Sequence, residues 1–192
     1  MGHTALKSQA LSAPPYLFAF VIVLLTAYFS DRYQSRSTFI MLHSLLACIG
    51  YVTIAAGGYF RWQNHTIRYL GLYPATAGFF SAITIIITWT INNQESDSRK
   101  GTGMAMLNLI GQCGPLVGTS IFPKTDAPYY VRGMTICAAF MALVGILAFI
   151  LRVVLIKQNK RRRGSKGGAG VSIPLVEGGV PKIERKAFTF ML

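Results

Sequence analysis

Six polar side chains stand inside long apolar stretches of this chain, and they are the residues best suited to handle a polar ligand. Three of them, Asn108, Gln112 and Thr119, recur near one face of a helix predicted over residues 103–122. An amide in hydrocarbon is costly unless it meets a partner, so this face should line a bundle interior or a wet cavity. It could bind a polar solute, or it could make interhelical hydrogen bonds without one.

The other three, Tyr73, Ser81 and Thr84, share a face of a helix predicted over residues 67–91. We take all six as candidates for a solute path. Serine and threonine hydroxyls can also bond back to their own helix, so this second face has a purely structural interpretation as well.

Small residues run beside both polar faces at helical spacing. They are Gly71, Ala75, Gly78 and Ala82 in the helix over residues 67–91, and Gly111, Gly114 and Gly118 in the helix over residues 103–122. In a membrane, small residues let neighbouring backbones approach closely, so each series is expected to be a helix-packing seam. Pro115 should add a kink to the helix over residues 103–122, between Gly114 and Gly118.

A short charged group, Asp31, Arg32 and Arg36, follows the first apolar stretch. These residues could form ion pairs that clamp cytoplasmic helix ends and break during alternating access. They could also serve only to fix membrane orientation. His43 lies in the next apolar stretch without a second ligand nearby. We expect it to be packed or hydrogen-bonded rather than a metal ligand or a proton relay.

Motifs for catalysis are missing from the sequence. It contains no glycine-rich phosphate loop, no nucleophile elbow and no paired carboxylates within the apolar stretches. Cys48, Cys113 and Cys137 lie in apolar runs without a CxxC pair, so they are expected to act as small hydrophobic residues. We therefore expect no enzyme activity, no cofactor and no metal site.

The composition points to a membrane protein. Hydrophobic residues make up 52% of the chain, charged residues 13%, and the mean hydropathy is +0.44. Five apolar stretches predict an all-α polytopic membrane protein with five transmembrane helices, at residues 13–30, 38–57, 67–91, 103–122 and 132–156. Residues 1–163 would form the membrane domain, with the lipid bilayer as its main partner.

Basic residues set the expected orientation. The net charge of +13 is concentrated after the last apolar stretch, between Lys157 and Lys166. The positive-inside rule places this cluster, and the C-terminus, in the cytoplasm, where it would contact anionic lipids rather than nucleic acid. The glycosylation pattern at Asn64 then falls on the opposite side. Residues 164–192 are rich in glycine and charge and are predicted to form a disordered tail.

Several short motifs follow one another in a characteristic order over residues 11–163. They are Leu11-Ser12-Ala13-Pro14-Pro15-Tyr16, Asp31-Arg32, Trp89 with Asn92-Asn93, Arg99-Lys100-Gly101, the stretch from Gly111 through Gly118-Thr119 to Ile121-Phe122, and Asp126-Ala127-Pro128-Tyr129-Tyr130 followed by Gly133. In this order the chain resembles the C-terminal half of a major facilitator superfamily transporter, most closely the fungal anion:cation symporters of the allantoate and nicotinate permease-like group. The loop over residues 27–36 departs from the superfamily pattern, with alanine and serine in the glycine places.

The resemblance implies that the five helices correspond to the last five of a twelve-helix transporter. It implies secondary transport by alternating access of small organic anions or carboxylates, with a coupling cation expected to be a proton, at the plasma membrane. An odd number of helices with an external start suggests a fragment or truncated member, expected to be inactive alone. The alternative is a small non-transporting membrane interaction or structural protein, or the relic of a transporter gene.

Overall fold

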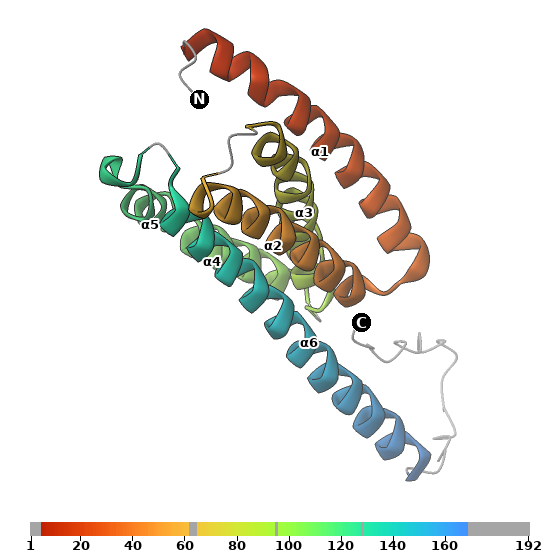
Figure 1. The fold of residues 1–192 in the computed structure, drawn as a ribbon. Helices are drawn as coiled ribbons and strands as arrows, with labels where there is room; N and C mark the ends of the chain where they lie inside the picture. The colour runs from red at the N-terminus through yellow and green to blue at the C-terminus, as the bar shows by residue number, and fades with distance from the viewer. Residues whose placement is uncertain (1–4, 62–64, 95, 128, 169–192) are drawn as a thin grey trace, which may run out of the picture.

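The computed structural model describes residues 5–61, 65–94, 96–127 and 129–168. Within these ranges the chain is helical and contains no strand (Figure 1). The helices are α1 (Ala5–Tyr33), α2 (Arg36–Tyr59), α3 (His65–Asn92), α4 (Asp97–Gly111), α5 (Gly114–Ile121) and α6 (Val131–Gly168), with a short 3-10 turn at Lys124–Asp126. The expectation of an all-α polytopic protein is confirmed.

Four helices are long and apolar enough to cross a membrane. The segments that qualify are Gln9–Tyr33, Arg36–Tyr59, Thr66–Asn92 and Val131–Arg161. The shortest has 24 residues, which gives about 36 Å of helix at 1.5 Å per residue and exceeds the hydrocarbon thickness of a bilayer. Large apolar side chains such as Leu17, Leu45 and Ile146 are exposed on their outer faces, as expected for surfaces that meet lipid.

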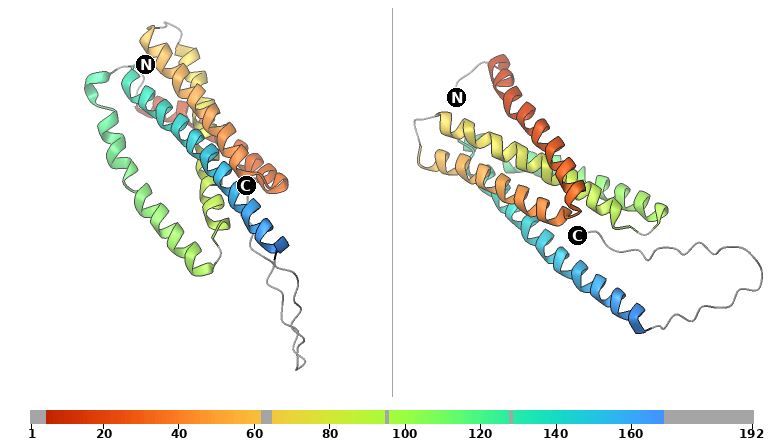
Figure 2. Two further views of the ribbon diagram at one scale, coloured as in Figure 1. Left: turned by 90° about the horizontal axis from the view of Figure 1, so that it is seen from below. Right: turned by 90° about the vertical axis from the view of Figure 1, so that its right-hand side faces the viewer.

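Helix α2 occupies the centre of the bundle, packed against α3 on one side and α6 on another. Its buried residues recur every three or four positions and include Ile40, Ala47 and Ile54. Ile40 joins Ile85 and Trp89 of α3 in one apolar cluster, together with two residues of α6. Helix α1 rests mainly on α3, so α1 and α6 flank the α2–α3 pair (Figure 2).

A proline inside α1 leaves a backbone carbonyl open to a hydrogen bond from another helix. Pro15 has no N–H, so the carbonyl of Leu11, four residues earlier, loses its helical donor. The Tyr69 hydroxyl of α3 donates to that carbonyl at 3.0 Å, and the Tyr73 hydroxyl donates to Tyr69 at 3.5 Å. A backbone group that the sequence leaves open is thereby satisfied from the neighbouring helix.

Most observed helix ends lie one to three residues beyond the predicted ones, but α1 begins at Ala5 rather than at residue 13, and two further corrections apply. The continuous helix expected over residues 103–122 is interrupted, because Pro115 cannot donate to the Gly111 carbonyl and glycines flank the break. The chain turns at Gln112 and Cys113, leaving helices of 15 and 8 residues. Helix α6 continues to Gly168, past the tail boundary expected at residue 164. Asn64 and residues 169–192 lie outside the described residues.

Helix α4 begins outside the apolar region with a side-chain cap. The Arg99 amide donates to the Ser96 hydroxyl at 3.4 Å, and Lys100 Nζ donates to Asp97 Oδ1 at 2.8 Å. This bond to Lys100 holds the pKa of the Asp97 carboxyl below its usual value. No residue of α4 or α5 is buried, and the two helices follow one side of the bundle (Figure 2).

Candidate functional site

The small residues of α3 pack closely against α2. A Cβ added at Gly78 would lie 2.5 Å from the His43 carbonyl oxygen and 2.6 Å from the Ala47 nitrogen. A Cβ at Gly50 of α2 would lie 2.4 Å from the nitrogen of Ala75. The obstructing atoms are backbone, so α2 and α3 touch along a seam that only glycine permits. The predicted packing role of this series is confirmed.

The glycines of α4 and α5 are in the opposite situation. A Cβ at Gly111, Gly114 or Gly118 would meet no atom within 4 Å among the described residues. The predicted seam is present in sequence, yet nothing in the described part of the chain packs on it.

The polar residues beside those glycines are exposed as well. Asn108 and Gln112 lie on the surface of α4 and at its end, and Thr119 lies on α5 beyond the break. The Thr119 hydroxyl donates to the Leu116 carbonyl of its own helix at 2.8 Å. Two amides exposed beside an open glycine series mark a face suited to meet a further helix or a wet cavity.

The three candidates on α3 have mostly local surroundings. Tyr73 donates to Tyr69 in the network that reaches α1, and half-buried Thr84 donates to its own helix at the Phe80 carbonyl, 2.8 Å away. Ser81 is fully buried, and its Oγ has no hydrogen-bond partner within the described residues. The hydrogen bonds and ring contacts of the described side chains do not join these three to Asn108, Gln112 or Thr119.

The charged residues after α1 form an ion pair that ties helix ends together. Arg36 Nη2 lies 2.7 Å from Asp31 Oδ1, with the Arg36 side chain 7% exposed and that of Asp31 66% exposed. When the Asn92 amide is oriented with its oxygen toward Arg36, that oxygen accepts from Nη1 and Nη2 at 2.8 and 2.9 Å. The end of α1, the start of α2 and the end of α3 therefore meet at one guanidinium. Arg32, which follows Asp31 in sequence, is exposed.

A fourth helix is joined to the same end by a contact that the sequence analysis missed. Arg152 Nη1 of α6 donates to the Thr38 hydroxyl of α2 at 2.6 Å, and Thr38 is 2.7 Å from the Ser35 hydroxyl. A single arginine at the edge of an apolar run is the sequence signal for such a contact.

His43 is buried and makes two hydrogen bonds, as the sequence analysis expected. Its Nδ1 is 2.9 Å from the Phe39 carbonyl oxygen in its own helix, and its Nε2 is 3.0 Å from the Thr26 hydroxyl of α1. The same hydroxyl donates to the Ile22 carbonyl at 2.7 Å. Thr26 was not among the predicted residues.

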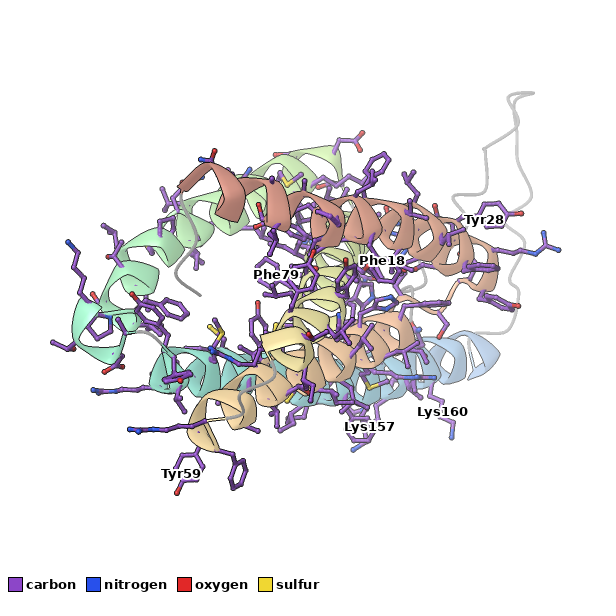
Figure 3. The ribbon with its side chains drawn as sticks, turned by 45° about the horizontal axis from the view of Figure 1, so that its top comes forward. Phe18, Tyr28, Tyr59, Phe79, Lys157 and Lys160 are labelled. Carbon is purple, nitrogen blue, oxygen red and sulfur yellow. The ribbon has the colours of Figure 1, made fainter. Side chains whose placement is uncertain are left out.

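The opposite end of the bundle carries its own polar contacts. Arg68 of α3 donates to the Tyr129 carbonyl at 3.2 Å and lies 5.0 Å from the centre of the Tyr129 ring. Beside it, an open pocket of about 490 Å³ is lined by Arg61, Asp126 and Arg132, among others. Figure 3 shows Tyr59 at this end, whereas Tyr28 and Lys160 lie toward the other.

Among known proteins, several fungal transporters are similar to this chain in sequence. The chain is 27% identical over 171 residues to the MFS-type transporter cnsO of Penicillium expansum, covering 85% of this chain and 32% of that protein. It is 28% identical over 166 residues to the high-affinity nicotinic acid transporter of Saccharomyces cerevisiae, covering 86% and 29%. It is 28% identical over 171 residues to the MFS transporter prlL of a fungal species, covering 88% and 34%.

The chain thus spans about a third of the length of these curated relatives. No family model matches it. No solved structure matches it significantly. Together with four helices long and apolar enough to span a bilayer, the matches support an integral membrane protein related to major facilitator transporters.

Proposed function

We propose that this chain forms part of a secondary transporter for small organic anions, driven by a proton and working by alternating access. The observation that carries the proposal is its similarity, over 86% of its length, to a nicotinic acid transporter. The finer assignment to the fungal anion:cation symporters depends on the motif order noted above. In this assignment the chain supplies one wall of a solute site and does not transport alone.

The packing of the helices supports a shared site. Helix α2 packs against α3 and α6, and α1 packs against α3, whereas α4 and α5 leave Asn108, Gln112 and three glycines open. Transporters of this type bind their solute between two repeats, so each repeat must present an unfilled polar face. We assign that face to α4 and α5, and the gate at the cytoplasmic end to Asp31, Arg32 and Arg36.

We place the protein in the plasma membrane with its C-terminus in the cytoplasm. Lys157, Lys160 and Arg161 are exposed in the C-terminal part of α6. Figure 3 shows Lys160 toward the end of the bundle where Tyr28 lies, three residues before Asp31 in sequence. Single cysteines introduced at Lys160 and at Tyr59 into a chain without native cysteines should react with an impermeant reagent from opposite sides. Labelling of both from one side would overturn this orientation.

Uptake into proteoliposomes tests the function. The chain alone is expected to take up no labelled nicotinate under an inward proton gradient. When it is reconstituted with the complementary segment of the yeast nicotinic acid transporter, gradient-dependent uptake should appear. Saturable uptake by the chain alone would disprove a shared site. A folded, co-purifying pair that moves neither nicotinate nor allantoate would refute the organic-anion assignment.

The open glycine series also supports a second candidate function. Gly111, Gly114 and Gly118 could dock onto another membrane helix without any solute being moved. This interaction protein would form a defined oligomer or complex through α4 and α5 while remaining silent in every uptake measurement. The reconstitution above separates the two candidates, because only a transporter wall responds to the proton gradient.

A further inference from the structure

We propose that His43 and Thr26 form a proton-binding site at the contact between α1 and α2. The donors and acceptors around the imidazole carry this inference. Its role in transport depends on the function proposed above, whereas proton binding itself can be tested in the chain alone.

The Phe39 carbonyl fixes one side of the ring. A carbonyl oxygen can only accept, and it lies 2.9 Å from His43 Nδ1, so Nδ1 must carry a proton. The tautomer with its proton only on Nε2 would bring two lone pairs together at this distance. That tautomer is therefore excluded, and the remaining forms are the neutral ring protonated on Nδ1 and the imidazolium.

Thr26 can bond either of these two forms. Its hydroxyl has one hydrogen, which can be donated to the Ile22 carbonyl at 2.7 Å or to His43 Nε2 at 3.0 Å. With the neutral ring, the hydroxyl donates to Nε2, and the Ile22 carbonyl keeps its helical bond from the Thr26 N–H. With the imidazolium, the hydroxyl donates to the Ile22 carbonyl and its oxygen accepts from Nε2–H.

These hydrogen bonds suit the site to gain and lose a proton. His43 is 7% exposed, so a ring nitrogen or ring N–H left without a partner would be costly. Rotation of the Thr26 hydroxyl matches Nε2 in both forms, because the hydroxyl donates to the neutral ring and accepts from the imidazolium. A proton bound at the Nε2 lone pair would thus be held by Thr26 and released when α1 moves relative to α2.

Few other ionisable groups face this site. On α3, Gly78 lies against the His43 backbone, and no titratable residue occurs from residue 74 to 92. On α6, Cys137 and Arg152 are the only titratable residues between positions 133 and 156, and Arg152 is bound to Thr38. Cys48 and Tyr51 of α2, with exposed Tyr16 and Tyr28 of α1, complete the set within the apolar stretches of those two helices.

The charged neighbours toward the nearer end already hold one another. Asp31 and Arg36 form an ion pair, with Arg36 seven positions before His43, about 10 Å along the helix axis. In sequence, Ser30 precedes Asp31 on α1 and Ser37 follows Arg36 on α2, and the buried Oγ atoms of both have no hydrogen-bond partner in the described part of the chain.

Histidine NMR on the full 192-residue chain in lipid nanodiscs tests the proton site. The chain has three histidines, and His43→Gln identifies the signal of interest. The ring nitrogens of His43 should change from the neutral to the imidazolium pattern between pH 8 and pH 4.5. At a fixed pH within this range, Thr26→Val should lower the charged fraction at least threefold, because the acceptor for Nε2–H is removed.

Thr53→Val is the matched control. Thr53 bonds its own helix at the Ile49 carbonyl in the same i−4 manner, at 2.8 Å, and its hydroxyl makes no hydrogen bond to a histidine among the described residues. The charged fraction should stay unchanged in this variant. A His43 ring that stays neutral down to pH 4.5, or equal effects of the two valine variants, would overturn the proposed site.

A second measurement addresses coupling in the reconstituted pair. His43→Gln should reduce proton-driven accumulation at least tenfold while leaving exchange of labelled for unlabelled solute intact. Accumulation that still follows the proton gradient in this variant would refute the coupling role, although the NMR result would stand. If the pair moves no solute at all while His43 titrates as described, the proposed function fails and the proton site survives.

Discussion

Gly78→Ala is the substitution whose effect the structure specifies most closely. The added methyl would lie 2.5 Å from the His43 carbonyl oxygen, whereas ordinary contact begins at 3.4 Å, a shortfall of about 0.9 Å. Both nearby atoms other than the Ala47 Cβ belong to the α2 backbone, so no rotamer change can relieve the clash. The two helices must separate along a seam that also includes Gly50 and Ala75.

The expected loss of stability follows from two opposing terms. Overpacking a tight contact costs about 1–3 kcal/mol. Replacing a glycine within a helix recovers roughly 0.5–1 kcal/mol of backbone entropy. The net result is a free energy of unfolding lower by about 1–2 kcal/mol, or about 2–8 °C in melting temperature for a chain of this size. Thermal unfolding in detergent, followed by circular dichroism, measures it.

Gly118→Ala in α5 is the matched control. A methyl at this position meets nothing within 4 Å in the described structure, so only the helix-propensity gain remains and stability should rise slightly or stay unchanged. If Gly78→Ala is as stable as the unmodified chain, the α2–α3 seam is not packed as described. If Gly118→Ala becomes destabilising only when the complementary transporter segment is present, that segment packs on α5.

Three further substitutions test separate contacts. Asp31→Asn removes the carboxylate paired with buried Arg36 and should lower the free energy of unfolding by about 1–2 kcal/mol, since the pair is half exposed to solvent. Asp97→Asn removes the carboxylate of the exposed Asp97–Lys100 pair and should leave the free energy of unfolding unchanged. Tyr69→Phe leaves the proline-freed carbonyl of α1 without its donor and should cost about 1 kcal/mol in the same melts. Gln112→Leu should abolish uptake by the reconstituted pair without reducing the amount of folded protein.

Each of these predictions has a result that would contradict it. An effect of Asp97→Asn equal to that of Asp31→Asn would mean that burial of Arg36 adds nothing to the pair. Tyr59→Phe removes an exposed hydroxyl at the C-terminal end of α2 and should leave the free energy of unfolding unchanged. A loss of stability equal to that of Tyr69→Phe would show that the Tyr69 hydroxyl contributes nothing through its hydrogen bond. Unchanged uptake per folded molecule in Gln112→Leu would remove Gln112 from the solute path.

The sequence predicts the long helices well because lipid imposes a simple rule. A stretch of some twenty apolar residues must be helical to satisfy its backbone, and charged residues such as Asp31 and Arg36 then mark its end. The break before Pro115 was anticipated only as a kink. Whether a proline bends or divides a helix depends on its packing partners, and α5 has few among the described residues.

Of the contacts between helices, the sequence predicts the close packing along the small residues of α3, but not the individual hydrogen bonds. Pro15 shows that the Leu11 carbonyl needs a donor, but it does not identify Tyr69 as that donor. The bond from Thr26 to His43 depends on how α1 is rotated against α2, which no pattern in either helix specifies. The glycines of α3 and of α5 look alike in sequence, yet one series is packed against backbone and the other is open.

This contrast divides the polar residues into two groups with different consequences. Asp31, His43 and Tyr69 meet partners within the chain, so in this structure their contacts join α1, α2 and α3. Asn108 and Gln112 lie on a face that no described residue covers, and an uncovered amide in hydrocarbon is costly. Both candidate functions therefore require a second surface at α4 and α5. They differ in whether that surface is dry, as in a docked helix, or lines a wet cavity that a solute can enter.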